Sequence, residues 1–282
     1  MSELKGKKIS FIGGGNMAQA LISGLIGRGI KPTDITVAAP SEETRALFRS
    51  KRINTVNPKG NTETDNPKVA VESADIVVLA VKPQVMGEVL PEFADVLDKQ
   101  LLISVAAGLS TETLSKMVGG YQNIVRAMPN TPSTIQKGAT GLYATDSISE
   151  DDKQLAGAVM AASGLVSWVE EEEQLHAVTA VSGSAPAYFF FMIESMINAG
   201  VELGLDEKQA SALAMQTALG AAQMAITSDE TPAELRRKVM SPNGTTQAAV
   251  ESLQQDGLDK IMKKAMQACY DRSVQISQEL AQ

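Results

Sequence analysis

Short apolar runs alternate with helical patterns along the first half of the chain. We expect strands at residues 8–12, 35–38, 76–80, 101–105, 123–127, 141–144 and 166–169. Several of these runs lack polar alternation, which is typical of parallel strands covered by helices on both faces. Successive parallel strands are joined by right-handed crossovers. The pattern therefore predicts an α/β fold with a doubly wound, mostly parallel sheet.

Helical patterns replace the strand-like runs in the second half of the chain. Ser184 and Pro186 indicate one helix start, and Asp206 can cap the next helix. The sequence Thr231-Pro232-Ala233-Glu234 has the form of a capping box with proline at the first helical position. The last helix places five apolar residues on one face, namely Leu258, Ile261, Met262, Ala265 and Cys269. This half is therefore expected to be all-α.

The change of pattern near residue 169 predicts two domains. The α/β domain should cover residues 1–169, and the helical domain should cover residues 170–282. The acidic run at residues 170–173 lies at this boundary, and we expect it to be a solvated linker.

Composition narrows the class of protein. The net charge of −8 argues against nucleic-acid binding, which usually needs a basic surface. One cysteine and one histidine argue against a zinc site of the usual ligands, and we expect no metal. The lone cysteine and the absence of a secretory pattern predict a reducing, cytoplasmic location. The most apolar stretch, residues 185–205, contains two glutamates, so we expect a buried helix rather than a membrane span.

A glycine-rich turn follows the first predicted strand. Gly13, Gly15 and Ala18 fit the pattern G-x-G-x-x-A, and Asn16 and Met17 open the helix after it. The first glycine permits the tight turn, the second lets main chain approach a pyrophosphate, and the small third residue allows close packing of helix on sheet. The helix N-terminus offers free N–H groups to the phosphates. We therefore predict a Rossmann dinucleotide-binding domain.

The end of the second predicted strand indicates which dinucleotide binds. NAD sites usually carry a carboxylate there to hold the ribose 2′-hydroxyl. Here Pro40 and Ser41 occupy the place, and Glu42 comes only afterwards. Ser41 and nearby main-chain N–H groups suit a 2′-phosphate, with Arg45 as a source of positive charge. The sequence thus favours NADPH, with NADH as the alternative donor.

Other predicted strands end in small or conformationally restricted residues. The third is followed by Ala80, Val81, Lys82 and Pro83, the fourth by Ala106 and Ala107, and the fifth by the sequence Met128-Pro129-Asn130-Thr131-Pro132. The carboxyl ends of parallel strands line the ligand crevice of an open α/β sheet. We therefore predict cofactor contacts at Ala80 to Pro83 and at Ala106 and Ala107.

A turn in the helical half is a candidate substrate site. The sequence Ser241-Pro242-Asn243-Gly244-Thr245-Thr246 joins two predicted helices. Pro-Asn-Gly is a strong turn signal, and it places N–H groups and two hydroxyls at the start of the next helix. Such a start is a natural seat for a carboxylate.

The chain resembles the pyrroline-5-carboxylate reductase family over nearly its full length. The motifs that carry the resemblance are residues 11–17 (FIGGGNM), 80–83 (AVKP), 104–108 (SVAAG), 126–132 (RAMPNTP), 181–188 (VSGSAPAY) and 241–246 (SPNGTT). The resemblance implies reduction of 1-pyrroline-5-carboxylate to L-proline by NADPH or NADH, the last step of proline synthesis. It also implies a helical domain through which two subunits dimerise, and dimers that can join into a larger ring.

The same resemblance assigns several residues. Substrate binding falls to Ser241, Gly244, Thr245 and Thr246, and contact with the adenosine phosphate falls to Asn66. Two positions depart from the family pattern. Asn243 stands where glycine is common, but asparagine tolerates a left-handed backbone. Arg237 stands where an acidic residue is usual.

The expected chemistry is hydride addition to a cyclic imine. Alcohol oxidation must also remove a proton and generally uses a base. Hydroxyacid dehydrogenases of similar architecture rely on a lysine in the helical half, whereas residues 154–207 contain no lysine or arginine. We therefore expect catalysis by positioning, with Thr246 orienting the substrate. His176 is expected at the surface and Cys269 in packing.

Three alternatives remain open at this point. One is an NADP-dependent β-hydroxyacid dehydrogenase, and the second is a reductase of another imine. The third is a dinucleotide-binding regulator without turnover. The turn that offers a carboxylate seat argues against the third.

Overall fold

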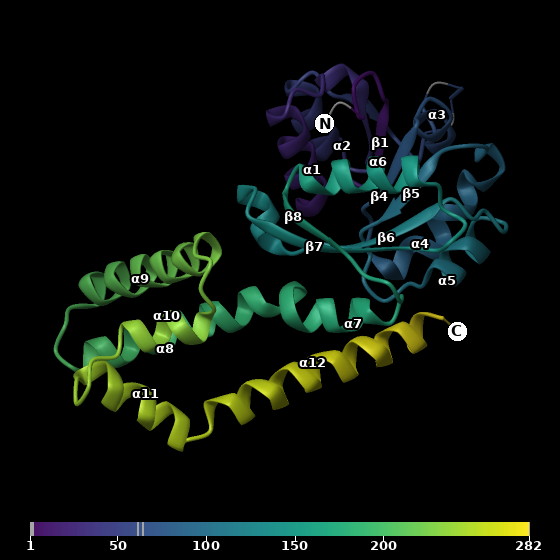
Figure 1. The fold of residues 1–282 in the computed structure, drawn as a ribbon. Coiled ribbons are helices and arrows are strands. Elements are labelled where there is room, and N and C mark those ends of the chain that lie inside the picture. Colours follow the sequence, from purple (N-terminus) through teal and green to yellow (C-terminus); the bar gives the residue numbers. More distant parts are fainter. Residues whose placement is uncertain (1–2, 61, 64, 282) are drawn as a thin grey trace. The chain divides into compact units, whose positions relative to one another are not determined.

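The computed structural model describes residues 3–60, 62, 63 and 65–281 and divides the chain into two compact units (Figure 1). Unit 1 comprises Met1–Ser184 together with Cys269–Gln282, and unit 2 comprises Ala185–Ala268. This division describes how compactly the chain packs and not which residues bind cofactor or substrate. The boundary between functional domains expected near residue 169 therefore stays a prediction.

Unit 1 is built on one eight-stranded sheet. Its strands are β1 (Ile9–Ile12), β2 (Ile35–Ala38), β3 (Asn54–Val56), β4 (Ile76–Leu79), β5 (Leu101–Ser104), β6 (Ile124–Met128), β7 (Gly138–Ala144) and β8 (Gly164–Trp168). Their order is β3-β2-β1-β4-β5-β6-β7-β8, and β6–β7 is the one antiparallel pair. The strand order reverses at β1, which is the switch point where an open α/β sheet binds ligands. The predicted doubly wound, mostly parallel sheet is confirmed.

Helices cover both faces of this sheet. They are α1 (Asn16–Gly27), α2 (Glu42–Ser50), α3 (Pro67–Glu72), α4 (Pro83–Val89), α5 (Thr111–Met117) and α6 (Glu150–Ala161). One core cluster joins α1, α2 and α6 to the sheet, and a second joins α3, α4 and α5. Successive residues of β4 alternate between them, with Ile76 and Val78 in the first cluster and Val77 and Leu79 in the second. This burial on both faces explains the continuous apolar runs.

The sequence pattern missed strand β3. Two of its three residues, Asn54 and Thr55, are polar, so no apolar run marks it. Its place comes from main-chain pairing with β2, in which Ala38 lies opposite Val56. Four short 3₁₀ turns within the described residues were also not predicted; they are η1 (Pro32–Asp34), η2 (Leu90–Glu92), η3 (Ala94–Val96) and η4 (Thr131–Ile135).

The helix expected to begin at Ser184 is the continuation of an earlier one. Helix α7 (Gln174–Val178) passes through a π-helical turn, η5 (Thr179–Gly183), into α8 (Ala185–Glu202). The side-chain amide of Asn130 donates to the Ser182 carbonyl over 3.0 Å. A π turn leaves main-chain groups without their usual hydrogen-bond partners in the helix, and the Asn130 side chain binds one of these groups, the Ser182 carbonyl. Proline at position 186 therefore lies in a continuing helix.

Unit 2 is helical, as predicted. It holds α8, α9 (Glu207–Thr227), α10 (Pro232–Lys238), α11 (Thr245–Gln255) and the first part of α12 (Leu258–Leu280). Asp206 caps α9 by accepting from the Gln209 N–H. Thr231 and Glu234 form the predicted capping box of α10. These starts were predictable because capping acts within one turn of helix.

The apolar stretch expected to be buried is exposed within the single chain. Phe189, Phe190 and Phe191 of α8 are 60%, 66% and 70% exposed. By length and hydropathy alone, Gln174–Glu202 would suffice to cross a membrane, and 11% of its most apolar window is buried. So large an apolar surface marks a place where another molecule packs.

Candidate active site

The glycine-rich turn has the geometry that its sequence predicted. Gly13 has φ of +106°, and a Cβ there would lie 2.6 Å from the Ala80 carbonyl oxygen. A Cβ on Gly15 would meet no protein atom within 4 Å. Gly13 is therefore fixed by the packing of β1 against the end of β4, whereas the bare backbone at Gly15 faces open space. That space is where the fingerprint places a pyrophosphate.

The start of α1 carries no side-chain cap. Gly15 is the N-cap residue, and the exposed Asn16 and partly exposed Met17 follow it. The first turn has no acidic residue. Free N–H groups and the positive end of the helix dipole therefore remain for an anion, which fits the phosphates of a dinucleotide.

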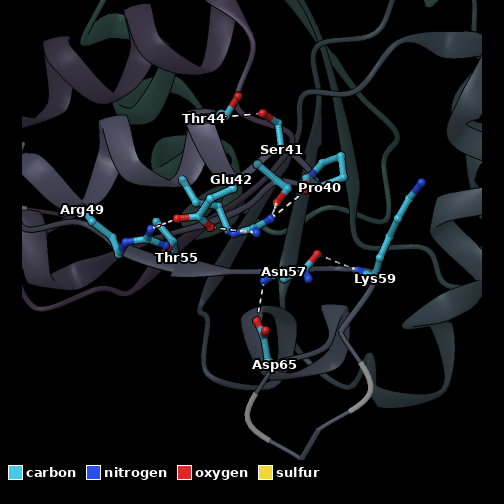
Figure 2. Close-up of polar contacts among 11 residues, drawn as sticks. Pro40, Ser41, Glu42, Thr44, Arg49, Thr55, Asn57, Lys59 and Asp65 are labelled. Atoms are coloured by element: carbon cyan, nitrogen blue, oxygen red, sulfur yellow. Dashed lines mark hydrogen bonds and ion pairs between the residues drawn. The ribbon is translucent and has the colours of Figure 1, made fainter.

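Figure 2 shows the end of β2, where the adenosine half of a dinucleotide would lie. Ser41 is the N-cap of α2, and its hydroxyl accepts from the Thr44 N–H at 3.4 Å. The Arg45 guanidinium donates to the carbonyls of Ala39 and Pro40 over 2.6 and 2.9 Å. Arg45 therefore braces the turn, and Ser41 lies exposed at the helix start.

Glu42 pairs with both arginines of α2. Its carboxylate binds Arg45 at 2.9 Å and also pairs with Arg49. The Arg49 hydrogen bond, and after it the Arg45 one, hold the pKa of Glu42 below its ordinary value. The carboxylate thus stays ionised and engaged with both guanidinium groups.

Asn66 is the N-cap of α3. Its side-chain oxygen accepts from the N–H groups of Lys68 and Val69, and its amide nitrogen donates to the carbonyls of Thr62 and Glu63. The side chain is partly exposed and already holds the loop after β3. Its contact with the adenosine phosphate stays a prediction.

The residues after β4 gather beside the glycine turn. Ala80 donates its N–H to the Ile12 carbonyl over 2.8 Å. The side chain of Val81 borders Gly13, and the exposed Lys82 is the N-cap of α4, with Pro83 at the first helical position. The structure therefore places Ala80 and Val81 against Gly13, and Lys82 and Pro83 follow them at the start of α4.

The small residues after β5 differ in their surroundings. Ala107 is exposed at the sheet edge, whereas Ala106 is buried. Gly108 has φ of +83°, and a Cβ there would lie 2.9 and 3.0 Å from Ile276 and Leu280 of the chain's last helix. Gly108 is therefore small because that helix packs on the turn, a reason that the sequence pattern did not reveal.

A buried ion pair lies at the supposed linker. Arg126 of β6 donates to Glu172 over 2.7 Å, and the two side chains are 8% and 19% exposed. The same carboxylate accepts from the Thr111 N–H and hydroxyl over 2.7 and 3.0 Å. Glu172 thus fixes the start of the helical segment to the sheet and to α5. The expectation of a solvated linker is wrong for this residue.

His176, which was expected at the surface, is partly buried because it packs against the C-terminal part of α12. Its Nδ1 is 2.9 Å from the Ser273 hydroxyl, and its ring meets Tyr270 edge-on with centroids 5.8 Å apart. Burial, and after it the charge of Arg126, lowers the pKa of His176. The residue is therefore a packing group near the ion pair.

The candidate substrate turn precedes α11. Asn243 has φ of +56°, so asparagine does adopt the left-handed conformation expected of it. Its N–H donates to the Gln247 side chain over 2.8 Å. Gly244 is the N-cap of α11 and provides no side-chain cap, while Thr245 and Thr246 form the first helical turn. The start of α11 therefore offers N–H groups and hydroxyls to a carboxylate.

Ser241 and Gly244 define the shape of this turn. The Gly244 N–H donates to the Ser241 carbonyl over 3.0 Å. A Cβ on Gly244 would lie 3.0 Å from that carbonyl oxygen and closer still to the Ser241 hydroxyl. Arg237, the departure from the family pattern, lies in the last turn of α10, where positive charge is favoured by the helix dipole. Among the described residues, no group of His, Cys, Asp and Glu side chains has an arrangement that could hold a metal ion.

Two family models match the chain. Residues 172–276 match pyrroline-5-carboxylate reductase dimerisation, and residues 8–108 match NADP oxidoreductase coenzyme F420-dependent. The pyrroline-5-carboxylate reductase of Pseudomonas aeruginosa is 44% identical over 277 residues, which cover 98% of each chain.

Solved structures agree with these matches. A pyrroline-5-carboxylate reductase from Coxiella burnetii aligns with a TM-score of 0.90 and 40% identity, covering 96% of this chain and 98% of the other. A Plasmodium falciparum pyrroline carboxylate reductase with NADP bound aligns with a TM-score of 0.82 and 29% identity, with the same coverage.

Proposed function

Because this chain belongs to the pyrroline-5-carboxylate reductase family, we propose that its two helix starts hold the two anionic reactants of that enzyme. The chain is an NAD(P)H-dependent reductase that converts 1-pyrroline-5-carboxylate to L-proline, the last step of proline biosynthesis. The 44% identity over 98% of both chains is the observation that carries this activity. The glycine turn would hold the dinucleotide, and the turn at Ser241 to Thr246 would hold the substrate carboxylate.

The chemistry asks for positioning more than for acid–base work. When bound, the nicotinamide cofactor supplies a hydride to the C=N carbon of the protonated imine. The ring nitrogen already carries its proton, so no protein base has to accept one. Gly244 and Thr245 at the start of α11 would hold the carboxylate, and the Thr246 hydroxyl would orient the ring nitrogen. Fixing this geometry is worth several orders of magnitude in rate.

NADPH is proposed as the preferred donor. The β2–α2 turn presents Ser41 and free main-chain N–H groups, and the neighbouring carboxylate of Glu42 is held by Arg49 and Arg45. A ribose 2′-hydroxyl would find no free carboxylate at Glu42. Cofactor binding is assigned to residues 1–169, with the predicted contacts at Gly13, Gly15, Asn16, Met17, Ser41, Asn66, Ala80, Val81, Lys82, Pro83, Ala106 and Ala107.

The helical domain is a dimerisation domain, so the protein forms a homo-oligomer. The exposed phenylalanines of α8 supply apolar surface for that contact. We assign substrate binding and dimerisation to residues 170–282, and we place the enzyme in the cytoplasm. Association of the dimers into a ring is proposed from the family resemblance.

The activity is tested by following the consumption of NADPH with imines and its formation with hydroxyacids. The chain should reduce 1-pyrroline-5-carboxylate rapidly and oxidise β-hydroxyacids with NADP⁺ no faster than the uncatalysed control. Reduction of other cyclic imines that lack the carboxylate should be slower, because the turn at Ser241 would then have no anion to bind. Equal rates with and without the carboxylate would contradict the assignment of this turn.

Gly15→Ala should weaken cofactor binding without weakening the fold. The new Cβ meets no protein atom within 4 Å, so the free energy of unfolding should stay unchanged. The methyl group would occupy the space of the pyrophosphate and raise the Kd for NADPH by about tenfold or more. Titration of intrinsic fluorescence gives the Kd, and chemical denaturation gives the stability. An unaltered Kd would show that the phosphates lie elsewhere.

Thr246→Ala should lower kcat/KM for the imine by about 100-fold, the size of effect that a small misplacement of a reacting group has. NADPH binding should be unaffected, because the residue lies on α11 and not on the dinucleotide turn. The matched variant is Thr246→Ser, which keeps the hydroxyl and should recover most of the rate. If the serine and alanine variants behave alike, the hydroxyl has no role in orientation.

A further inference from the structure

The loop after β3 carries a positively charged residue, Lys59, at the end of the sheet where the adenosine half of the cofactor would lie. In the register of β2 and β3, Ala38 lies opposite Val56, and the Ala39 N–H donates to the Val56 carbonyl over 3.1 Å. Ser41 follows Ala38 by three residues, and Lys59 follows Val56 by three residues. Both therefore emerge from the same carboxyl edge of two neighbouring parallel strands.

The main chain around Lys59 is held in place. The Lys59 N–H donates to the Asn57 side-chain oxygen over 3.1 Å, and the Asn57 N–H donates to the Asp65 carboxylate over 2.5 Å. The Gly60 N–H donates to the Asn57 carbonyl over 2.9 Å. In Figure 2 the Lys59 side chain points away from Asp65, on the opposite side of Asn57. The loop thus presents a lysine from a fixed base.

The charges around this edge single out Lys59. Arg45 binds two main-chain carbonyls and Glu42, and Arg49 pairs with the same carboxylate. Among the residues that the structure describes, the exposed ammonium of Lys59 makes no ion pair. A ribose 2′-phosphate carries a charge of about −1.5 to −2, so a neighbouring cation strengthens its binding.

We propose that Lys59 is a specificity-determining residue that binds the 2′-phosphate of NADPH together with the N-terminus of α2 at Ser41. The proposal rests on the cofactor preference given above and adds the residue that supplies the charge. Lys59 takes the role that was expected of Arg45, because the Arg45 guanidinium already binds the main-chain carbonyls of the turn. Its effect is confined to the 2′-phosphate, because it lies at the adenosine end of the sheet.

The test compares adenosine 2′,5′-bisphosphate with adenosine 5′-monophosphate as probes, using calorimetry on the full-length protein. Lys59→Ala should weaken binding of the bisphosphate by about tenfold and leave the monophosphate unchanged. The ratio of kcat/KM for NADPH to that for NADH should fall by a similar factor. Lys59→Arg should retain the preference. Lys51→Ala removes an exposed lysine at the other end of α2. It should change neither the relative affinity for the two probes nor the ratio of kcat/KM for NADPH to that for NADH.

The outcomes separate this proposal from those on which it rests. If the wild-type protein prefers the bisphosphate and Lys59→Ala keeps that preference, Lys59 is not the determinant. An equal loss for both probes would also overturn the proposal, because it would show a general effect on the loop. A wild-type protein that does not discriminate between the probes would refute the NADPH preference and Lys59 together. If Lys59→Ala has the expected effect but the wild-type protein fails to reduce the imine, the binding role of Lys59 would stand and the assigned enzymatic activity would be refuted.

Discussion

Arg126→Met should lower the free energy of unfolding by roughly 3 kcal/mol, because it leaves the Glu172 carboxylate largely buried without its cation. Arg126 and Glu172 are 8% and 19% exposed, so water can replace little of the lost interaction. The hydrogen bonds from Thr111 to Glu172 remain and limit the loss. Urea denaturation at a fixed protein concentration measures the change, since a dimer's stability depends on concentration.

Arg272→Met is the matched control for this prediction. Arg272 contacts Glu279 over the same 2.7 Å, but the two side chains are 56% and 59% exposed. Exposed pairs contribute little to stability, so the variant should unfold at the same denaturant concentration as the wild type. The double variant Arg126→Met with Glu172→Met should recover part of the lost stability, because no unpaired charge is then buried. Equal effects of the Arg126 and Arg272 variants would show that burial does not determine how much an ion pair contributes to the free energy of unfolding.

Gly244→Ala should lower kcat/KM for 1-pyrroline-5-carboxylate by about 100-fold while the affinity for NADPH stays unchanged. The added methyl group would lie 3.0 Å from the Ser241 carbonyl oxygen and closer still to the Ser241 hydroxyl. The turn must then shift, and the N–H groups at the start of α11 move with it. A displacement of about 1 Å in a positioning group can reduce the rate this much. Steady-state kinetics at saturating NADPH measure the loss.

The control for this substitution is Gly27→Ala. Gly27 is the last residue of α1, and a Cβ there meets no atom within 4 Å. Alanine should leave the kinetics unchanged and raise stability by up to about 1 kcal/mol, as is usual at compatible positions. Combining Gly244→Ala with Ser241→Ala removes the hydroxyl contact but not the carbonyl contact, so it should restore the turn only in part. Wild-type kinetics in Gly244→Ala would show that the turn does not bind substrate.

Features that depend on neighbouring residues were predictable from the sequence. The glycine turn, the cap at Asp206 and the capping box at Thr231 each involve residues within one turn of helix. The left-handed conformation of Asn243 was expected for the same reason, since the tolerance of asparagine for it is local. Continuous apolar runs also identified the buried parallel strands, because burial on both faces removes the need for polar alternation.

Only the tertiary structure decided the features that join distant parts of the chain. Arg126 and Glu172 are 46 residues apart in sequence, and no local pattern distinguishes Glu172 from the other acidic residues beside it. Gly108 is small because Ile276 and Leu280 pack on it, and β3 exists because β2 pairs with its main chain. Likewise, Glu42 pairs with Arg45 and Arg49, whereas Lys59 at the same edge of the sheet makes no ion pair with the residues that the structure describes. Local sequence determines backbone conformation within a few residues, whereas the partner of a charge or of a bare glycine is set by packing across the fold.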